Sequence, residues 1–167
     1  MSRLADVPTT VVTGAPGAGK TTWLLHELAR RPADERRAVL LTEAGEATLP
    51  GMPHVVVAAA EPGCICCVGQ VGLRVALTRL LREAMPQRLY IELGDPAHLA
   101  ASLRTLRNPW LAPVIAIAEV VGVLDAAAAP PSDEWLAQLT VLHVRNDPDG
   151  ACAARVAARR PALARPG

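Results

Sequence analysis

Hydrophobic residues along the chain gather in six short runs rich in valine, leucine, isoleucine and alanine. They cover residues 11–13, 38–42, 54–58, 89–92, 114–124 and 140–144. Runs of this kind, separated by segments with helical spacing, are typical of buried parallel strands joined by crossover helices. The pattern predicts an α/β fold with a mostly parallel central sheet.

Three segments between these runs carry the spacing or the boundary signals of helices. Residues 21–31 read TTWLLHELARR and end before Pro32, and residues 71–85 place apolar side chains at helical spacing. Residues 133–139 follow Ser132, which is suited to cap a short helix. The last residues, 161–167, are rich in proline and arginine, and we expect them to fray. The sequence thus predicts one domain over residues 1–160 and a frayed tail.

Composition agrees with a single domain and limits the partners. The 167 residues are 51% hydrophobic, which is enough to build one core. The 17 basic and 16 acidic residues form no basic block, which argues against nucleic acid or a membrane as a partner. The N-terminal sequence lacks the apolar stretch of a signal peptide. We expect a cytoplasmic protein, whose cysteines are better suited to metal binding, catalysis or packing than to disulfides.

One stretch, GAPGAGKT at residues 14–21, fits the phosphate-binding pattern GxxxxGK[ST]. Its Lys20 is the only lysine among the 17 basic residues. Glycines let successive backbone N–H groups face a phosphate, and the following helix adds the positive end of its dipole. We expect Lys20 to reach the outer phosphates and act in catalysis, and the Thr21 hydroxyl to bind Mg²⁺. The residues predicted to bind nucleotide are Gly14, Gly17, Ala18, Gly19, Lys20, Thr21 and Thr22.

A second stretch, EPGCICCVGQ, places Cys64, Cys66 and Cys67 within four residues. Thiolates are soft ligands, so the cluster favours Zn²⁺ or another soft or borderline transition metal. A tetrahedral site needs a fourth ligand or an exchangeable group. The candidates for that position are Glu43, Glu46, His54, Glu61 and His98. A structural zinc site and a redox-active disulfide stay open as alternatives.

Four stretches occur in an order that resembles the CobW-like family of P-loop GTPases, metallochaperones related to UreG and HypB. They are GAPGAGKTTWLLHEL, LLTEAGE, EPGCICCVGQVGLRVALTRLL and YIELGDPAHL. The pentapeptide GCxCC is the most specific marker, and the resemblance covers most of residues 8–150. It implies a three-layer P-loop NTPase fold with GTP, Mg²⁺ and zinc as ligands. It does not extend to the family's C-terminal domain, which we expect to be absent.

The resemblance also implies roles for residues outside the phosphate loop. The segment TEAGE keeps Glu43 and Glu46 of the family's switch segment, and Glu92 resembles the acidic, catalytic residue that ends the second nucleotide-binding strand. The following segment, IELGDP, is shorter than in the family. The tetrapeptide VRND stands where the family has Asn-Lys-x-Asp, so Asp147 is expected to bind guanine while the stem of Arg145 covers the base. GTP is thereby favoured over ATP, and a surface turn is the alternative.

Together these features predict a metal-linked GTPase. Hydrolysis of GTP would change the geometry of the segment that carries Cys64, Cys66 and Cys67, called the cysteine loop below. The resemblance implies metal delivery to a client metalloprotein or zinc homeostasis, and it is compatible with a homodimer. Two alternatives stay open. A shortened relative would bind nucleotide or metal without turnover, and an ATP-dependent small-molecule kinase would use the phosphate loop but not the thiols.

Overall fold

A parallel sheet forms the centre of the computed structural model, which describes residues 6–42, 49–59, 70–94 and 96–163. Within these ranges its strands are β1 (Val7–Thr13), β2 (Arg37–Leu41), β3 (Val55–Ala59), β4 (Arg88–Leu93), β5 (Ile115–Asp125) and β6 (Val141–Arg145). They lie in the order β3-β2-β4-β1-β5-β6, and every neighbouring pair is parallel. All the predicted strands are therefore confirmed, and only β1 begins well before its predicted start. Its first residues include Pro8, which a strand tolerates near its beginning.

Five helices and two single 3₁₀ turns accompany the strands in the part of the chain that the structure describes. They are α1 (Lys20–Arg30), α2 (Gln70–Ala84), η1 (Pro96–His98), α3 (Leu99–Leu106), α4 (Asp133–Gln138), α5 (Ala151–Arg159) and η2 (Pro161–Leu163), of which α5 and η2 follow the last strand. The three predicted helices are confirmed as α1, α2 and α4. The Ser132 Oγ accepts a hydrogen bond from the Trp135 N–H at 3.2 Å, so the predicted cap of α4 is also confirmed. Among the described residues, no helix is long and apolar enough to cross a membrane.

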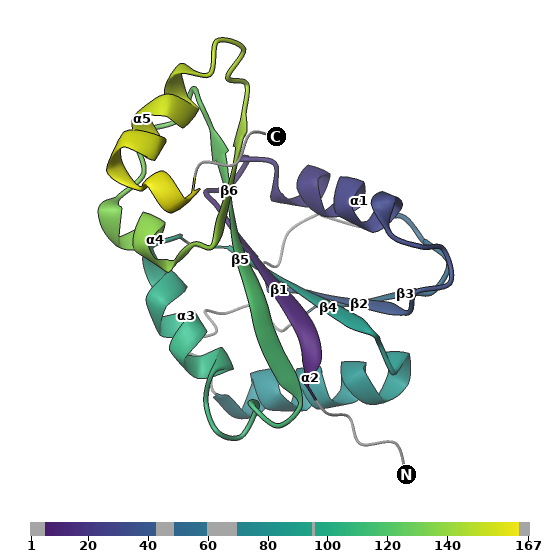
Figure 1. Cartoon of the computed structure of the whole chain (residues 1–167). Coiled ribbons are helices and arrows are strands. Elements are labelled where there is room, and N and C mark those ends of the chain that lie inside the picture. Colours follow the sequence, from purple (N-terminus) through teal and green to yellow (C-terminus); the bar gives the residue numbers. More distant parts are fainter. Residues whose placement is uncertain (1–5, 43–48, 60–69, 95, 164–167) are drawn as a thin grey trace.

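The helices cover the sheet in two layers, because successive residues of each strand face opposite sides. On the face of the sheet covered by α1, Leu24 and Leu28 pack against the strand residues Val12, Val39 and Tyr90. The opposite face carries residues from α2, α3, α4 and α5 in one larger cluster. Figure 1 shows α1 on one side of the sheet and α3, α4 and α5 on the other. The result is a three-layer α/β arrangement.

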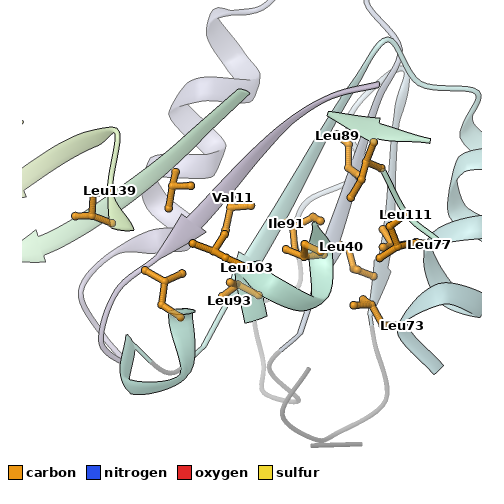
Figure 2. Packing of buried hydrophobic residues seen from close by; sticks show 14 of the residues in the cluster. Val11, Leu40, Leu73, Leu77, Leu89, Ile91, Leu93, Leu103, Leu111 and Leu139 are labelled. Carbon is orange, nitrogen blue, oxygen red and sulfur yellow. The ribbon is translucent and has the colours of Figure 1, made fainter. Parts of the chain in front are cut away.

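The larger cluster is built almost entirely from aliphatic side chains. Leu73 and Leu77 of α2 face Leu40 and Ile91 of the sheet, and all four are buried. Figure 2 shows these residues pointing into one continuous layer. Burying a leucine of this kind contributes about 1.5–3 kcal/mol relative to leaving it exposed. A core without phenylalanine therefore still holds α2 firmly on the sheet.

The predicted tail differs from the observed end of the chain. Pro161–Leu163 form the turn η2, and Leu163 is only 2% exposed because it packs into the larger cluster. In the structure these three residues therefore pack against the core, whereas the sequence led us to expect fraying from residue 161. Proline and arginine suggested a solvated tail, whereas the single leucine between them provides the anchor. Residues 164–167 lie outside the described part of the chain.

Candidate functional site

The phosphate-binding pattern lies where β1 ends and α1 begins, at the carboxyl edge of the sheet. Gly14 follows β1 directly, and a Cβ there would lie 2.4 Å from the Val123 carbonyl oxygen of β5. Only glycine fits that approach. Ala15, Pro16 and Gly17 are exposed, and Ala18 is buried. A parallel sheet gathers ligand sites at this edge, so the loop is well placed to bind an anion.

Lys20 is the first residue of α1 and is only 4% exposed. Its ammonium donates hydrogen bonds to the carbonyl oxygens of Gly14, at 2.8 Å, and Ala15, at 3.3 Å. The side chain thus folds back over its own loop. A buried ammonium must have polar partners, and these two carbonyls hold the positive charge beside the loop's N–H groups.

The N-terminus of α1 adds to this positive environment. Gly19 is the N-cap of the helix, with φ 98°, and it has no side chain to accept a capping hydrogen bond. The first turn of α1 contains no acidic residue. The first N–H groups of a helix have no partner within it and carry partial positive charge. Thr21 is half-buried and Thr22 is exposed at this end. The predicted residues of the loop and the first helical turn therefore form one contiguous candidate site.

Glu92 lies at the same edge, on the strand next to β1. Its register partners are Val12 of β1 and Leu41 of β2, and the side chain is 5% exposed. The Glu92 carbonyl oxygen accepts a hydrogen bond from the Thr42 hydroxyl at 2.7 Å. This bond ties the end of β2 to β4. The predicted carboxylate is thus brought to the end of the sheet where α1 starts with Lys20.

Arg145 makes a contact that the sequence did not reveal. Its guanidinium Nη1 donates to the Ala18 carbonyl oxygen at 3.1 Å, and the side chain lies against Gly19. The predicted role was to cover a base with its stem. In the structure the residue braces the phosphate loop from β6. Burial, followed by the positive charges of Arg145 and His26, lowers the pKa of the half-buried His143.

Asp147 lies in the turn between β6 and α5, where it caps the helix. Its two carboxylate oxygens accept hydrogen bonds from the N–H groups of Cys152, at 3.0 Å, and Ala153, at 2.8 Å. These bonds lower the pKa of Asp147. The preceding Asn146 donates to Asp125 at 2.8 Å. The carboxylate predicted to bind guanine therefore already accepts two hydrogen bonds from the N-terminal end of α5. Each of its oxygens can still accept a further hydrogen bond.

A cavity of about 430 Å³ opens beside the phosphate loop. The loop residues 15–18 form one wall, and the end of β5 with the segment leading to Trp135 forms the other. The Trp135 indole donates from Nε1 to the Thr13 hydroxyl at 3.2 Å, which fixes α4 next to the end of β1. No pattern in the sequence indicates this cavity, because its walls are mostly alanine and proline.

The thiol ligands predicted for zinc, Cys64, Cys66 and Cys67, lie outside the described residues. Glu43, Glu46 and Glu61 do as well. Of the other candidate ligands, His54 precedes β3 and so lies at the amino edge of the sheet, whereas His98 precedes α3 on the carboxyl side. Within the described ranges, no three histidine, cysteine, aspartate or glutamate side chains gather as a metal site. Cys152 is buried on α5.

Comparison with known proteins relates this site to one family. The family model "CobW/HypB/UreG, nucleotide-binding domain" matches residues 8–148. The chain is 36% identical over 121 residues to the zinc chaperone YeiR of Escherichia coli (strain K12), covering 70% of this chain and 37% of YeiR. It is 28% identical over 133 residues to the zinc chaperone CobW of Sinorhizobium sp, covering 73% of this chain and 37% of that protein. The chain spans well under half the length of these relatives.

Two solved structures share the fold. The Zn(II)-bound YjiA GTPase from E. coli aligns with a TM-score of 0.64 and 19% identity, over 92% of this chain and 54% of that chain. The hydrogenase maturation factor HypB from Archaeoglobus fulgidus aligns with a TM-score of 0.60 and 13% identity, over 94% and 78%. The predicted three-layer P-loop fold is thereby confirmed. Because the family model covers most of the chain and the phosphate loop is formed as its motif requires, the chain belongs to the CobW/HypB/UreG family, through its nucleotide-binding domain.

Proposed function

We propose that the chain is the GTP-binding domain of a zinc metallochaperone, in which GTP hydrolysis is coupled to zinc held by Cys64, Cys66 and Cys67. The observation that carries the proposal is the buried Lys20, held by its own phosphate loop at the edge where Glu92 ends the neighbouring strand. Relatives that are named zinc chaperones support the choice of metal. The chain spans only 37% of each, so the complete activity is part of the proposal.

The phosphate loop supplies positioning and charge. Lys20 and the first N–H groups of α1 neutralise the outer phosphates, and the fixed backbone needs little rearrangement. Gly14 keeps the loop close to β5, while Arg145 braces it from β6. The chain thus holds the phosphoryl group in a preorganised, positively charged cradle.

Mg²⁺ fits the donor groups at this edge. The Thr21 hydroxyl and the Glu92 carboxylate are hard oxygen ligands of the kind that Mg²⁺ prefers, and both lie where β4 ends and α1 begins. Bound there, Mg²⁺ would neutralise charge on the phosphates. We propose Glu92 as the group that orients this centre, a role distinct from the direct contact made by Lys20.

Zinc is the proposed cargo, and the sequence position of its thiols makes coupling feasible. The cysteines follow Ala59, which ends β3 at the same edge of the parallel sheet as the phosphate loop. Ala59 is three strands away from β1, or about 14 Å at the usual strand spacing. Cys64 follows Ala59 by five residues and can therefore lie up to roughly 17 Å from it. A change at the phosphates is therefore within reach of the cysteines.

Asp147 and its neighbours remain the proposed base-binding residues. A purine amino group would have to share the carboxylate oxygens with the N–H groups of Cys152 and Ala153. That competition predicts weaker discrimination between GTP and ATP than a dedicated acceptor would give.

Nucleotide chemistry is tested by fluorescent GTP binding and by phosphate release with Mg²⁺, using GTP and ATP in parallel. Lys20→Ala should lower turnover on the order of 100-fold, because it removes a charge aimed at the transferred group. Arg30→Ala, at the exposed far end of α1, is the matched control and should be unaffected. Binding without turnover would instead identify a non-hydrolysing module, and unchanged activity of Lys20→Ala would refute the site.

Zinc coupling is tested by anaerobic zinc titration of the reduced protein with GTPγS or with GDP. We expect one tight equivalent whose affinity differs between the two nucleotides and which is lost in the Cys66→Ser, Cys67→Ser double variant. Cys152→Ala controls for a thiol elsewhere in the chain. Equal affinity with both nucleotides would exclude coupling, and zinc binding retained by the double variant would exclude these ligands.

A further inference from the structure

A groove on the surface lies away from the phosphate loop. It has a volume of about 900 Å³ and runs between the outer face of α2 and the connection from α3 to β5. Figure 1 shows α2 beside this connection, below the sheet. Neither nucleotide binding nor the cysteine loop requires it. The functions proposed above therefore leave this groove without a role.

The apolar part of the groove is exposed to an unusual degree. Large hydrophobic side chains with high exposure are few in the described ranges, and two of them line this groove. Val75 is 61% exposed and Trp110 is 66% exposed. Tryptophan at such a site commonly anchors a partner, because it buries a large area at small entropic cost. The pair thus provides an apolar centre.

Arginines flank that centre. Arg74, Arg79 and Arg82 line the groove, and Glu83 is the acidic residue among its lining groups. Three cations against one anion form a local positive field, whereas the whole chain has a formal net charge of only +1. Guanidinium groups bind carboxylates through paired hydrogen bonds. The charge of the groove therefore complements an acidic ligand.

The two walls are held in place before any ligand binds. The Arg74 guanidinium lies 5.5 Å from the centre of the Trp110 ring, a cation–π contact between α2 and the facing connection. Below it, Leu111 is 3% exposed and packs in the same cluster as Leu77 of α2. A preformed groove loses less entropy when it binds a partner.

We propose that this groove docks an acidic peptide segment of a protein partner, with an apolar side chain of the segment against Val75 and Trp110 and its carboxylates on Arg79 and Arg82. An isolated anion would not use the apolar centre, and an uncharged apolar segment would not use the arginines. The proposal does not depend on the nucleotide or zinc chemistry proposed above.

The test uses the whole chain and a fluorescein-labelled peptide in which leucines alternate with pairs of glutamates. Saturable binding is expected by fluorescence anisotropy, at least about tenfold weaker for the Arg79→Glu, Arg82→Glu variant and for Trp110→Ala. Arg30→Glu, Arg155→Glu reverses two exposed arginines on other helices and should bind like the original chain. Thermal unfolding verifies that each variant folds, and GTP binding should be unchanged in the Arg79→Glu, Arg82→Glu variant and in Trp110→Ala.

Several results would overturn the proposal. One is no saturable binding of the acidic peptide, and another is equal binding of the peptide with glutamine in place of glutamate. Equal loss in both arginine pairs would show a non-specific charge effect. Tighter binding of a single-stranded oligonucleotide would assign the groove to another class of partner. Self-association abolished by Trp110→Ala would assign it to a second copy of the chain.

Discussion

Arg145 of β6 occupies the space next to Gly19, the residue that caps α1. A Cβ added to Gly19 would lie 1.7 Å from the Arg145 Nη1, and the same Nη1 donates to the carbonyl oxygen of Ala18. The end of β6 is therefore in direct contact with the phosphate loop. The glycine is needed for two reasons, its positive φ of 98° and the arginine beside it.

Gly19→Ala tests this relationship through stability. We expect a loss of about 1–2 kcal/mol in the free energy of unfolding from the left-handed backbone, and a further loss from displacing Arg145. The second part should disappear in an Arg145→Ala background, as measured by urea unfolding of the double-mutant cycle. Gly72→Ala is the control, because Gly72 lies in α2 with open space around it and alanine there should stabilise. Strict additivity of the two changes would contradict the contact.

The buried pair Thr13 and Trp135 gives a second prediction. Thr13→Val keeps the shape but leaves the Trp135 indole N–H without its acceptor. The free energy of unfolding should fall by about 1–3 kcal/mol. Trp135→Phe should then lower the free energy of unfolding by less in the Thr13→Val background than in the original chain. In that background the substitution removes an N–H group that already lacks its acceptor. Urea unfolding of all four proteins measures the coupling, and zero coupling would argue against the hydrogen bond.

Tyr90 is the single tyrosine of the chain, so its titration can be followed directly by ultraviolet absorbance. Burial, followed by the negative charge of Glu27, raises its pKa from 10.0 to about 12. Because the folded state holds this proton more tightly, the associated stability is complete below pH 10 and is lost as pH rises toward 12. Glu27→Gln should lower the pKa of Tyr90. A phenolate that forms near pH 10 in the folded protein would contradict the burial.

Asp147 gives the opposite pH dependence. Hydrogen bonds from Ala153 and Cys152 lower its pKa below 3.8, so its contribution to stability is present above that value and is lost as pH falls through the folded pKa. Asp147→Ala should destabilise the chain at pH 7, and the difference from the original protein should shrink in acid. Unfolding curves at pH 7 and pH 3 measure this. Asp34→Ala, at an exposed position before β2, is the control.

The strands and three of the helices could be predicted because each follows from a local pattern. Val39, Leu40 and Leu41 belong to an apolar run, which indicates a buried strand. Ser132 caps α4 through its own side chain. The helix α3 was missed, because its eight residues are too few for a clear period. Leu163 was missed as well, because a single apolar residue in a polar tail gives no pattern until its pocket is known.

The sequence by itself determined the phosphate loop, since GxxxxGK[ST] prescribes backbone turns that only its glycines allow and a lysine at one fixed position. It also determined the parallel sheet, through short apolar runs that alternate with segments of helical spacing. Only the tertiary structure decided that Arg145 braces the loop, that Asp147 caps α5 and that Trp110 meets Arg74 across a groove. Each of these joins residues that are distant in the chain or share no periodic pattern, so their meeting depends on how strands and helices pack.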